Sequence, residues 1–142
     1  MVSSRGLSVN CQFQNNSFGV DKGQPNQYPI WEAMYDSLGS IGILSIGATA
    51  NRSWDIDSVG DIPTAFETPF MISVTNTTNR DFKNNSAAWG KTTIDLGAPG
   101  TIIWSLGLNN TYRMSSGTSM ATPFVSGAIA LLMIMIVVRT SL

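Results

Sequence analysis

A serine that stands just before a long apolar run is the residue of this sequence best placed to do chemistry. The segment reads Gly117-Thr118-Ser119-Met120-Ala121-Thr122-Pro123, and the stretch from Gly127 to Val138 that follows carries no strongly polar side chain. If this stretch is helical, Ser119 lies in the first turn, where unpaired backbone N–H groups and the positive end of the helix dipole favour negative charge. Such a placement suits a nucleophile whose attack on a carbonyl group creates an oxyanion.

Two other interpretations of the serine segment compete with the nucleophile. Thr118 or Ser119 could serve only as the N-cap of the helix, because Thr and Ser are preferred there for their hydrogen bond to the backbone. The spacing also differs from the nucleophile elbow of α/β-hydrolases, which needs glycine two residues after the serine, where this chain has Ala121. For an isolated Thr-Ser pair the N-cap would be the preferred interpretation, so the surrounding residues must decide.

The complete seven-residue segment resembles the nucleophile motif of subtilisin-like serine proteases (subtilases) at every position. The resemblance implies that Ser119 is the catalytic nucleophile. It also implies that the other motif residues hold the serine in place; these are Gly117, Thr118, Met120, Ala121, Thr122 and Pro123. The family continues with a histidine that is not the catalytic one, and here Phe124 stands in its place. We expect this departure to affect packing rather than chemistry.

Two further segments resemble the substrate and oxyanion sites of the same family, in the order that the family requires. Asn16-Ser17-Phe18-Gly19 resembles its peptide-binding segment, which implies an extended peptide or protein substrate beside Ser17, Phe18 and Gly19. Ala48-Thr49-Ala50-Asn51 resembles its oxyanion segment, which implies that Asn51 donates its side-chain amide to the oxyanion. The preceding residues would line the substrate site, and these are Ala48, Thr49 and Ala50. Each segment by itself would be an ordinary turn.

The sequence contains no histidine, which is the usual general base of serine hydrolases. Subtilases supply their triad in the order Asp, His, Ser, and the catalytic aspartate begins an Asp-Ser/Thr-Gly motif. Asp36-Ser37-Leu38 and Asp57-Ser58-Val59 resemble this motif but lack its glycine, so we expect both to be surface loop residues. We therefore expect residues 1–142 to be the C-terminal portion of a subtilase peptidase domain, without the N-terminal half that carries the catalytic Asp and His. The isolated chain should be inactive, because nothing in it activates the Ser119 hydroxyl.

Two functions follow from this expectation. In the complete parent protein, the resemblance implies a serine endopeptidase that hydrolyses peptide bonds through an acyl-enzyme on Ser119. The alternative is a non-catalytic pseudo-protease module that binds extended peptides without turnover. The first function needs the missing half of the domain as a partner, whereas the second needs only the Ser17 segment.

Composition limits the remaining partners. The 142 residues, 43% of them hydrophobic, suffice for one domain with a core. The net charge of -1, with scattered charges, does not predict a nucleic-acid-binding surface. We expect no cofactor and no metal ligands here, and structural calcium is a possibility only for the parent. The family resemblance implies an extracellular or cell-envelope protein, although Met1 to Asn10 has no apolar run long enough for a signal peptide.

The elements that must position these residues alternate between strands and helices. Apolar spacing predicts a helix from Pro29 to Gly39, between a strand at Leu7–Phe13 and another at Ile41–Ile46. Further strands are predicted at Phe70–Val74 and Thr92–Leu96.

A hairpin around Asn109-Asn110 is predicted to lead into the serine segment. Strand, helix, strand order indicates an α/β fold. The resemblance implies a partial subtilisin-like three-layer fold with a mainly parallel sheet and a buried central helix that starts near Thr118. The uninterrupted apolar stretch of the last helix is about 12 residues, short for a membrane span, so we do not expect one.

Overall fold

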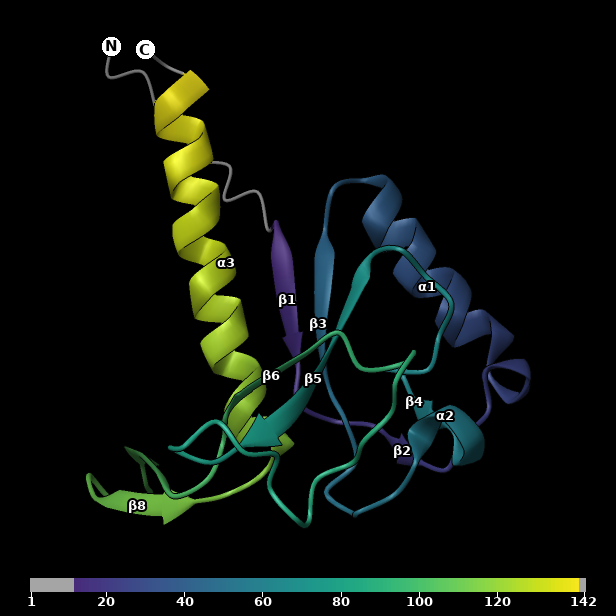
Figure 1. The fold of residues 1–142 in the computed structure, drawn as a ribbon. Coiled ribbons are helices and arrows are strands. Elements are labelled where there is room, and N and C mark those ends of the chain that lie inside the picture. Colours follow the sequence, from purple (N-terminus) through teal and green to yellow (C-terminus); the bar gives the residue numbers. More distant parts are fainter. Residues whose placement is uncertain (1–11, 141–142) are drawn as a thin grey trace, which may run out of the picture.

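The structure is a computed structural model that describes residues 12–140, with side chains as far as Met135. A four-stranded parallel sheet in the order β1-β3-β5-β6 forms its centre (Figure 1). Its strands span Phe13–Asn16 (β1), Leu44–Ala48 (β3), Met71–Thr77 (β5) and Leu96–Pro99 (β6). Cys11 and most of the strand predicted at Leu7–Phe13 lie outside the described residues.

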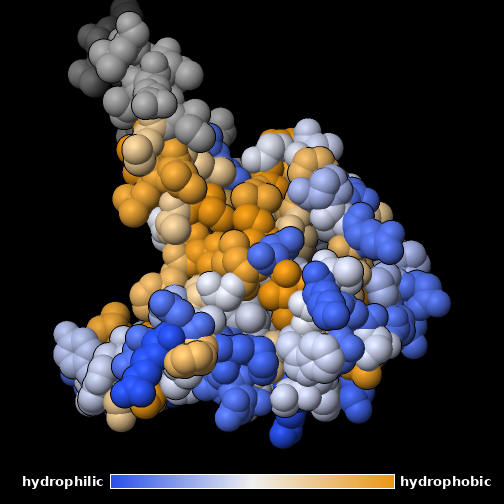
Figure 2. All heavy atoms as spheres, in the orientation of Figure 1, coloured by the Kyte–Doolittle hydropathy of each residue, from blue (hydrophilic) through white to orange (hydrophobic). Residues whose placement is uncertain are grey.

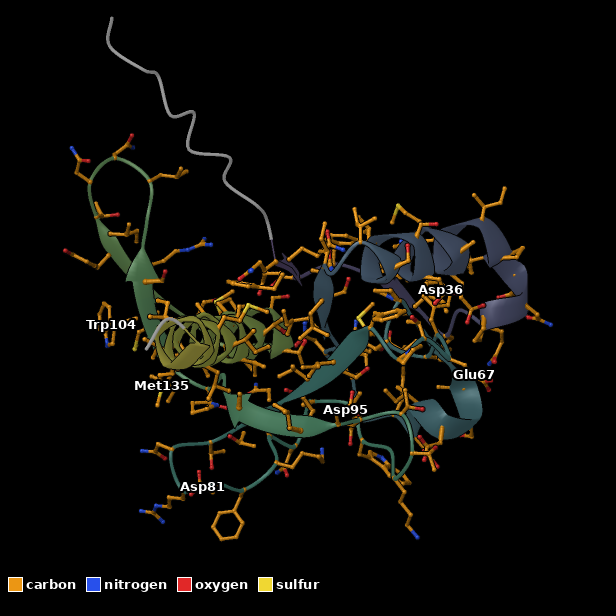
Figure 3. The ribbon with its side chains drawn as sticks, turned by 90° about the horizontal axis from the view of Figure 1, so that it is seen from above. Asp36, Glu67, Asp81, Asp95, Trp104 and Met135 are labelled. Atoms are coloured by element: carbon orange, nitrogen blue, oxygen red, sulfur yellow. The ribbon has the colours of Figure 1, made fainter. Side chains whose placement is uncertain are left out.

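Two helices cover opposite faces of this sheet and make a three-layer α/β fold. α1 (Pro29–Ser40) and α3 (Thr118–Thr140) lie on either side of the strands in both ribbon views (Figures 1 and 3). The core on the α3 side joins strand and helix residues, namely Ile46, Val74, Ala98, Ala121, Val125 and Ile129. The core on the α1 side is built around Tyr35, Ile62, Phe66 and Met71. Each large apolar side chain buried in this way contributes about 1.5–3 kcal/mol.

Short elements surround the sheet. β2 (Val20–Asp21) pairs antiparallel with β4 (Asp61–Ile62). A 3-10 helix, η1 (Pro25–Gln27), precedes α1, and α2 (Ile56–Val59) precedes β4. The predicted hairpin is confirmed as β7 (Ile103–Leu106) and β8 (Tyr112–Ser115), and it projects away from the sheet (Figures 1 and 3). Asn109 and Asn110 both have positive φ angles, which asparagine tolerates better than most residues and which the tight connection requires.

The helix predicted from Pro29 is confirmed, and proline at its first position fits a site whose N–H has no intrahelical partner. The next strand begins at Leu44 rather than Ile41, because the chain first leaves the helix through Gly42, whose φ is +86°. Glycine adopts that left-handed conformation without the steric cost that a Cβ atom would add.

The strand predicted at Thr92–Leu96 is wrong in position, because β6 runs from Leu96 to Pro99 and contains the residues expected to end it. A proline is tolerated there because β6 is an edge strand, which does not need every N–H for the sheet. Asp95 ties the start of this strand to β5, since its carboxylate accepts a hydrogen bond from the Ser73 N–H at 2.7 Å. Figure 3 labels Asp95 close to β6.

α3 packs against the sheet with one face and leaves apolar side chains exposed on another. Figure 2 shows hydrophobic residues gathered over this helix and the strands beside it. The exposed apolar residues at its far end are Leu131, Leu132, Ile134 and Met135. Within the described part of the chain, the segment Thr118–Met135 is long and apolar enough to cross a membrane, a test that core helices of soluble proteins also pass.

Two glycines in helices have opposite surroundings and give a test of the packing. A Cβ atom on Gly39 of α1 would lie 1.9 Å from Cγ of Phe70, whereas one on Gly127 of α3 meets no atom within 4 Å. We expect Gly127→Ala to raise the free energy of unfolding by about 0.5–1 kcal/mol, the usual gain of alanine over glycine in a helix. Gly39→Ala should lower it by about 1–3 kcal/mol, because the ring must move. Urea denaturation measures both, and shifts in the same direction would contradict this packing.

Candidate active site

The first turn of α3 lies at the carboxyl ends of β1 and β3, where side chains from distant segments meet. Ser17 directly follows β1, and Thr49 directly follows β3. The Thr118 hydroxyl, which is fully buried, donates a short hydrogen bond to the carbonyl oxygen of Thr49. Open α/β folds bind ligands at the carboxyl ends of parallel strands, so the position of this helix start is that of a functional site.

Asn51 is held in one orientation by Thr118. The Thr118 N–H donates a hydrogen bond of 2.8 Å to Asn51 Oδ1. Because a backbone N–H can only donate, the amide oxygen must face Thr118, and the Nδ2 group points the other way. Gly117 leaves room for this contact, since a Cβ atom there would lie 3.1 Å from the same oxygen. The predicted oxyanion donor is therefore oriented with its N–H groups free of the helix.

Ser119 and Ser17 contact each other through two reciprocal hydrogen bonds. The Ser17 hydroxyl donates to the Ser119 carbonyl oxygen at 3.2 Å, and the Ser119 hydroxyl donates to the Ser17 carbonyl oxygen at 3.4 Å. The second bond is long and weak, so the Ser119 hydroxyl is held loosely. The Ser119 N–H lies in the first turn of α3, where the helix itself offers no acceptor.

Pro123 explains why the Ser119 carbonyl oxygen accepts a hydrogen bond from a side chain rather than from the helix backbone. In a helix this oxygen would accept from the N–H four residues later, and proline has none. The Ser17 hydroxyl supplies the missing donor, and it thereby joins the serine motif to the end of β1. Thr122 contacts the same turn from inside the helix, since its hydroxyl donates to the Thr118 carbonyl oxygen at 2.9 Å.

A pocket of about 190 Å³ opens beside Ser119. Eight further residues line it, namely Phe18, Gly19, Asp21, Ala48, Thr49, Ala50, Asn51 and Asp61. Phe18 stacks on Trp31 with ring centroids 6.3 Å apart. All the residues that the sequence predicted for substrate binding line this pocket except Ser17, which borders it through Ser119.

The remaining motif residues support the helix rather than the pocket. Ala121 and Thr122 are fully buried, and Met120 is half-buried. Pro123 is exposed, and none of these four residues lines the pocket beside Ser119. Ala121 belongs to the core between α3 and the sheet, where a small side chain lets the helix lie close to the strands.

Sequence reasoning missed two acidic residues of the pocket, Asp21 and Asp61. Asp61 is 2% exposed, and its Oδ2 accepts hydrogen bonds from the Ala50 N–H at 2.9 Å and the Thr64 hydroxyl at 2.8 Å. Burial raises the pKa of Asp61 to about 6, and the nearby Asp21 charge adds to the effect. Strands of two residues show no periodicity, and only the hydrogen-bonded pairing of β2 with β4 brings these residues together.

Asp36 and Asp57, which sequence analysis did not assign to the triad, do not line the pocket beside Ser119. The Asp57 carboxylate accepts hydrogen bonds from the N–H groups of Lys91, Thr92 and Thr93, so it ties a loop together. Asp36 lies on α1, away from the start of α3 (Figure 3). Among the side chains that the structure describes, no three His, Cys, Asp or Glu residues gather as a metal site.

Comparisons with known proteins identify similar sequences. The model of the subtilase family matches residues 4–135. Subtilisin-like protease 2 of Plasmodium falciparum is 32% identical over 117 residues, which cover 82% of this chain and 9% of that protein. Subtilisin E of Bacillus subtilis is 32% identical over 129 residues, or 89% of this chain and 32% of its own length.

Solved structures show the same fold. A cold-adapted subtilisin-like serine proteinase superposes with a TM-score of 0.70 at 30% identity, over 84% of this chain and 40% of its own. The prenylagaramide maturation protease PagA superposes with a TM-score of 0.82 at 25% identity, over 92% of this chain and 46% of its own. This chain thus spans less than half the length of each of these relatives. Because the family model spans residues 4–135 and subtilisin-like relatives match most of the chain in sequence and in fold, the chain belongs to the subtilase family of serine proteases.

Proposed function

We propose that residues 1–142 supply the nucleophile and the oxyanion donors of a subtilisin-like serine endopeptidase. The observation that carries this proposal is the hydrogen bond from the Thr118 N–H to Asn51 Oδ1, which turns the Asn51 amide N–H groups away from the helix while both Asn51 and Ser119 line one pocket. Two donors, Asn51 Nδ2 and the Ser119 N–H, then serve a single developing oxyanion.

The proposed reaction begins when Ser119 Oγ attacks the carbonyl carbon of a peptide bond, as a general base removes the hydroxyl proton. The carbonyl oxygen becomes an oxyanion that Asn51 and the Ser119 N–H stabilise. Collapse of this tetrahedral intermediate expels the amine, which receives the proton, and leaves an ester on Ser119. Water, deprotonated by the same base, then hydrolyses the ester and releases the acid.

The general base of this scheme comes from outside residues 1–142, because these residues contain no histidine. We therefore propose that the isolated chain is inactive and that the rest of the catalytic domain packs against it. The exposed apolar residues of α3 fit this role, since Leu131, Leu132 and Ile134 would be covered by such a neighbour. This chain covers only 40% and 46% of the two solved relatives, which supports packing of a further part of the domain against it.

The absence of histidine also favours a second candidate, a non-catalytic module that binds extended peptides beside Ser17 and Phe18. The pocket beside this segment would give affinity without turnover. Retained peptide binding by residues 1–142, with no acylation of Ser119 in any longer form of the protein, would support this second function. An extracellular or cell-envelope location is proposed for both candidates from family membership alone.

Labelling with a fluorophosphonate tests the nucleophile. In the complete protease that contains these residues, we expect the probe to attach to Ser119, as located by mass spectrometry of the peptides. Ser119→Ala should abolish labelling, whereas Ser116→Ala should retain it, because Ser116 is an exposed hydroxyl that only accepts from the Ile102 N–H. Residues 1–142 alone should label weakly. Equal labelling of the complete protease before and after Ser119→Ala would contradict the assignment.

Replacement of Asn51 by aspartate tests the oxyanion donor without removing its contact with Thr118. Asn51→Asp keeps an oxygen for the Thr118 N–H but loses the amide N–H groups. We expect kcat of the complete protease to fall by at least about 10² to 10³-fold with little change in KM. That range is the one established for loss of such a donor in a subtilisin and is not calculated from this structure.

Steady-state kinetics with a peptide substrate measure this loss, and Asn110→Asp on the exposed hairpin turn serves as the matched control. A kcat that falls equally in both variants, or in neither, would rule out Asn51 as the donor.

A further inference from the structure

Two aspartates face each other across one strand pair at the pocket beside Ser119. In the antiparallel pairing of β2 with β4, Asp21 lies directly opposite Asp61, and both residues line the pocket. Residues directly opposite each other in such a pair have Cβ atoms about 4.5–5.5 Å apart, and like charges there are destabilising. The pairing therefore concentrates negative charge at one wall of the pocket.

Nothing in the described part of the chain neutralises this charge. The two donors to Asp61 both reach Oδ2, and no described group donates to Oδ1. The nearest cation in sequence, Lys22, does not bridge to Asp21, and its Nζ lies 4.3 Å from the centroid of the Trp54 ring. A carboxylate buried without a cation costs stability. The raised pKa of Asp61 has the same origin, because burial and the Asp21 charge both disfavour its ionised form.

We propose that this pocket binds the lysine or arginine side chain of a peptide substrate, with Asp61 as its charged partner and Asp21 as a second carboxylate at the wall. This inference rests on the proposed endopeptidase function. The methylene groups of such a side chain would lie along Phe18, Ala48 and Ala50, while its charged end reaches the carboxylates. The scissile carbonyl of the same residue would then lie beside Ser119, which lines the same pocket.

A side chain fits this pocket better than a metal ion. A calcium ion takes six to eight oxygen ligands, and no third acidic residue joins Asp21 and Asp61 within the described residues. A guanidinium or ammonium group needs only one or two acceptor oxygens. The side chains of Phe18, Ala48 and Ala50, which line the same pocket, offer no metal ligand.

Peptide hydrolysis by the complete protease tests the preference. The substrates differ only in the residue before the scissile bond, which is arginine, lysine or methionine. We expect kcat/KM to be at least about 10-fold higher for the arginine and lysine peptides than for the methionine peptide. Asp61→Asn should lower this ratio of kcat/KM values by about 10- to 100-fold, the range for loss of a charged hydrogen bond. Asp36→Asn, on the exposed face of α1, is the matched control and should leave the ratio unchanged. Equal or faster hydrolysis of the methionine peptide would overturn the inference while leaving the endopeptidase function intact.

A binding measurement that needs no turnover separates this inference from the function on which it rests. By calorimetry, the complete protease should bind benzamidine, a planar cation, more tightly than neutral benzamide. Asp61→Asn should lower the ratio of the benzamide Kd to the benzamidine Kd by at least about 10-fold. If no peptide is hydrolysed but this pattern holds, the endopeptidase function fails and the cation pocket stands. Benzamidine binding that is unchanged by Asp61→Asn would overturn the pocket.

The stability of Asp61→Asn supplies the control for folding. Because the folded-state pKa of Asp61 lies above its unfolded value, its contribution to stability is present when it is protonated and is lost as pH rises through about 6. Asparagine keeps an acceptor oxygen for the Ala50 N–H without the charge, so the variant should be more stable than the parent at pH 8. If it fails to fold, Asp21→Asn at the exposed strand gives the same tests with a smaller expected loss of basic preference, and an unchanged preference would overturn the inference.

Discussion

The attachment of the first turn of α3 to the ends of β1 and β3 is the constraint on which the site depends. The buried Thr118 attaches the helix to the end of β3 twice, through its hydroxyl to the Thr49 carbonyl oxygen and through its N–H to Asn51 Oδ1. The second bond also decides which end of the Asn51 amide faces the pocket. One residue of the helix thus fixes both the start of the helix and the direction of the proposed oxyanion donor.

The proline of the motif extends the same attachment to β1. Pro123 has no N–H to donate to the Ser119 carbonyl oxygen, so this oxygen accepts a hydrogen bond from the Ser17 hydroxyl instead. The missing helical hydrogen bond is thus replaced by a contact between residues 102 positions apart in sequence. Buried small residues such as Ala121 let the helix lie close to the sheet, and Gly117 lets Asn51 approach the chain. The other residues of the motif therefore pack or form hydrogen bonds around the Ser119 hydroxyl group.

Sequence reasoning predicted the parts of this arrangement that depend on local pattern. The serine motif, the Asn51 segment, the helix from Pro29 and the hairpin all have short-range signals, and the structure brings the predicted segments together around one pocket. β6 was misplaced because a Gly-Ala-Pro run looks like a break unless the strand is known to be an edge. Asp21 and Asp61 were missed because their meeting depends on the pairing of two strands of two residues each, about 40 residues apart, which has no local signal.

The orientation of Asn51 is the central claim, and a crystal structure of the complete protease with a phosphonylated Ser119 tests it most directly. The phosphoryl oxygen of such an adduct stands where the oxyanion forms. The arrangement predicts that this oxygen lies about 2.7–3.1 Å from Asn51 Nδ2 and from the Ser119 N–H, with the Thr118 N–H still bound to Asn51 Oδ1. A phosphoryl oxygen directed away from Asn51, or an Asn51 amide turned from Thr118 towards solvent, would contradict it.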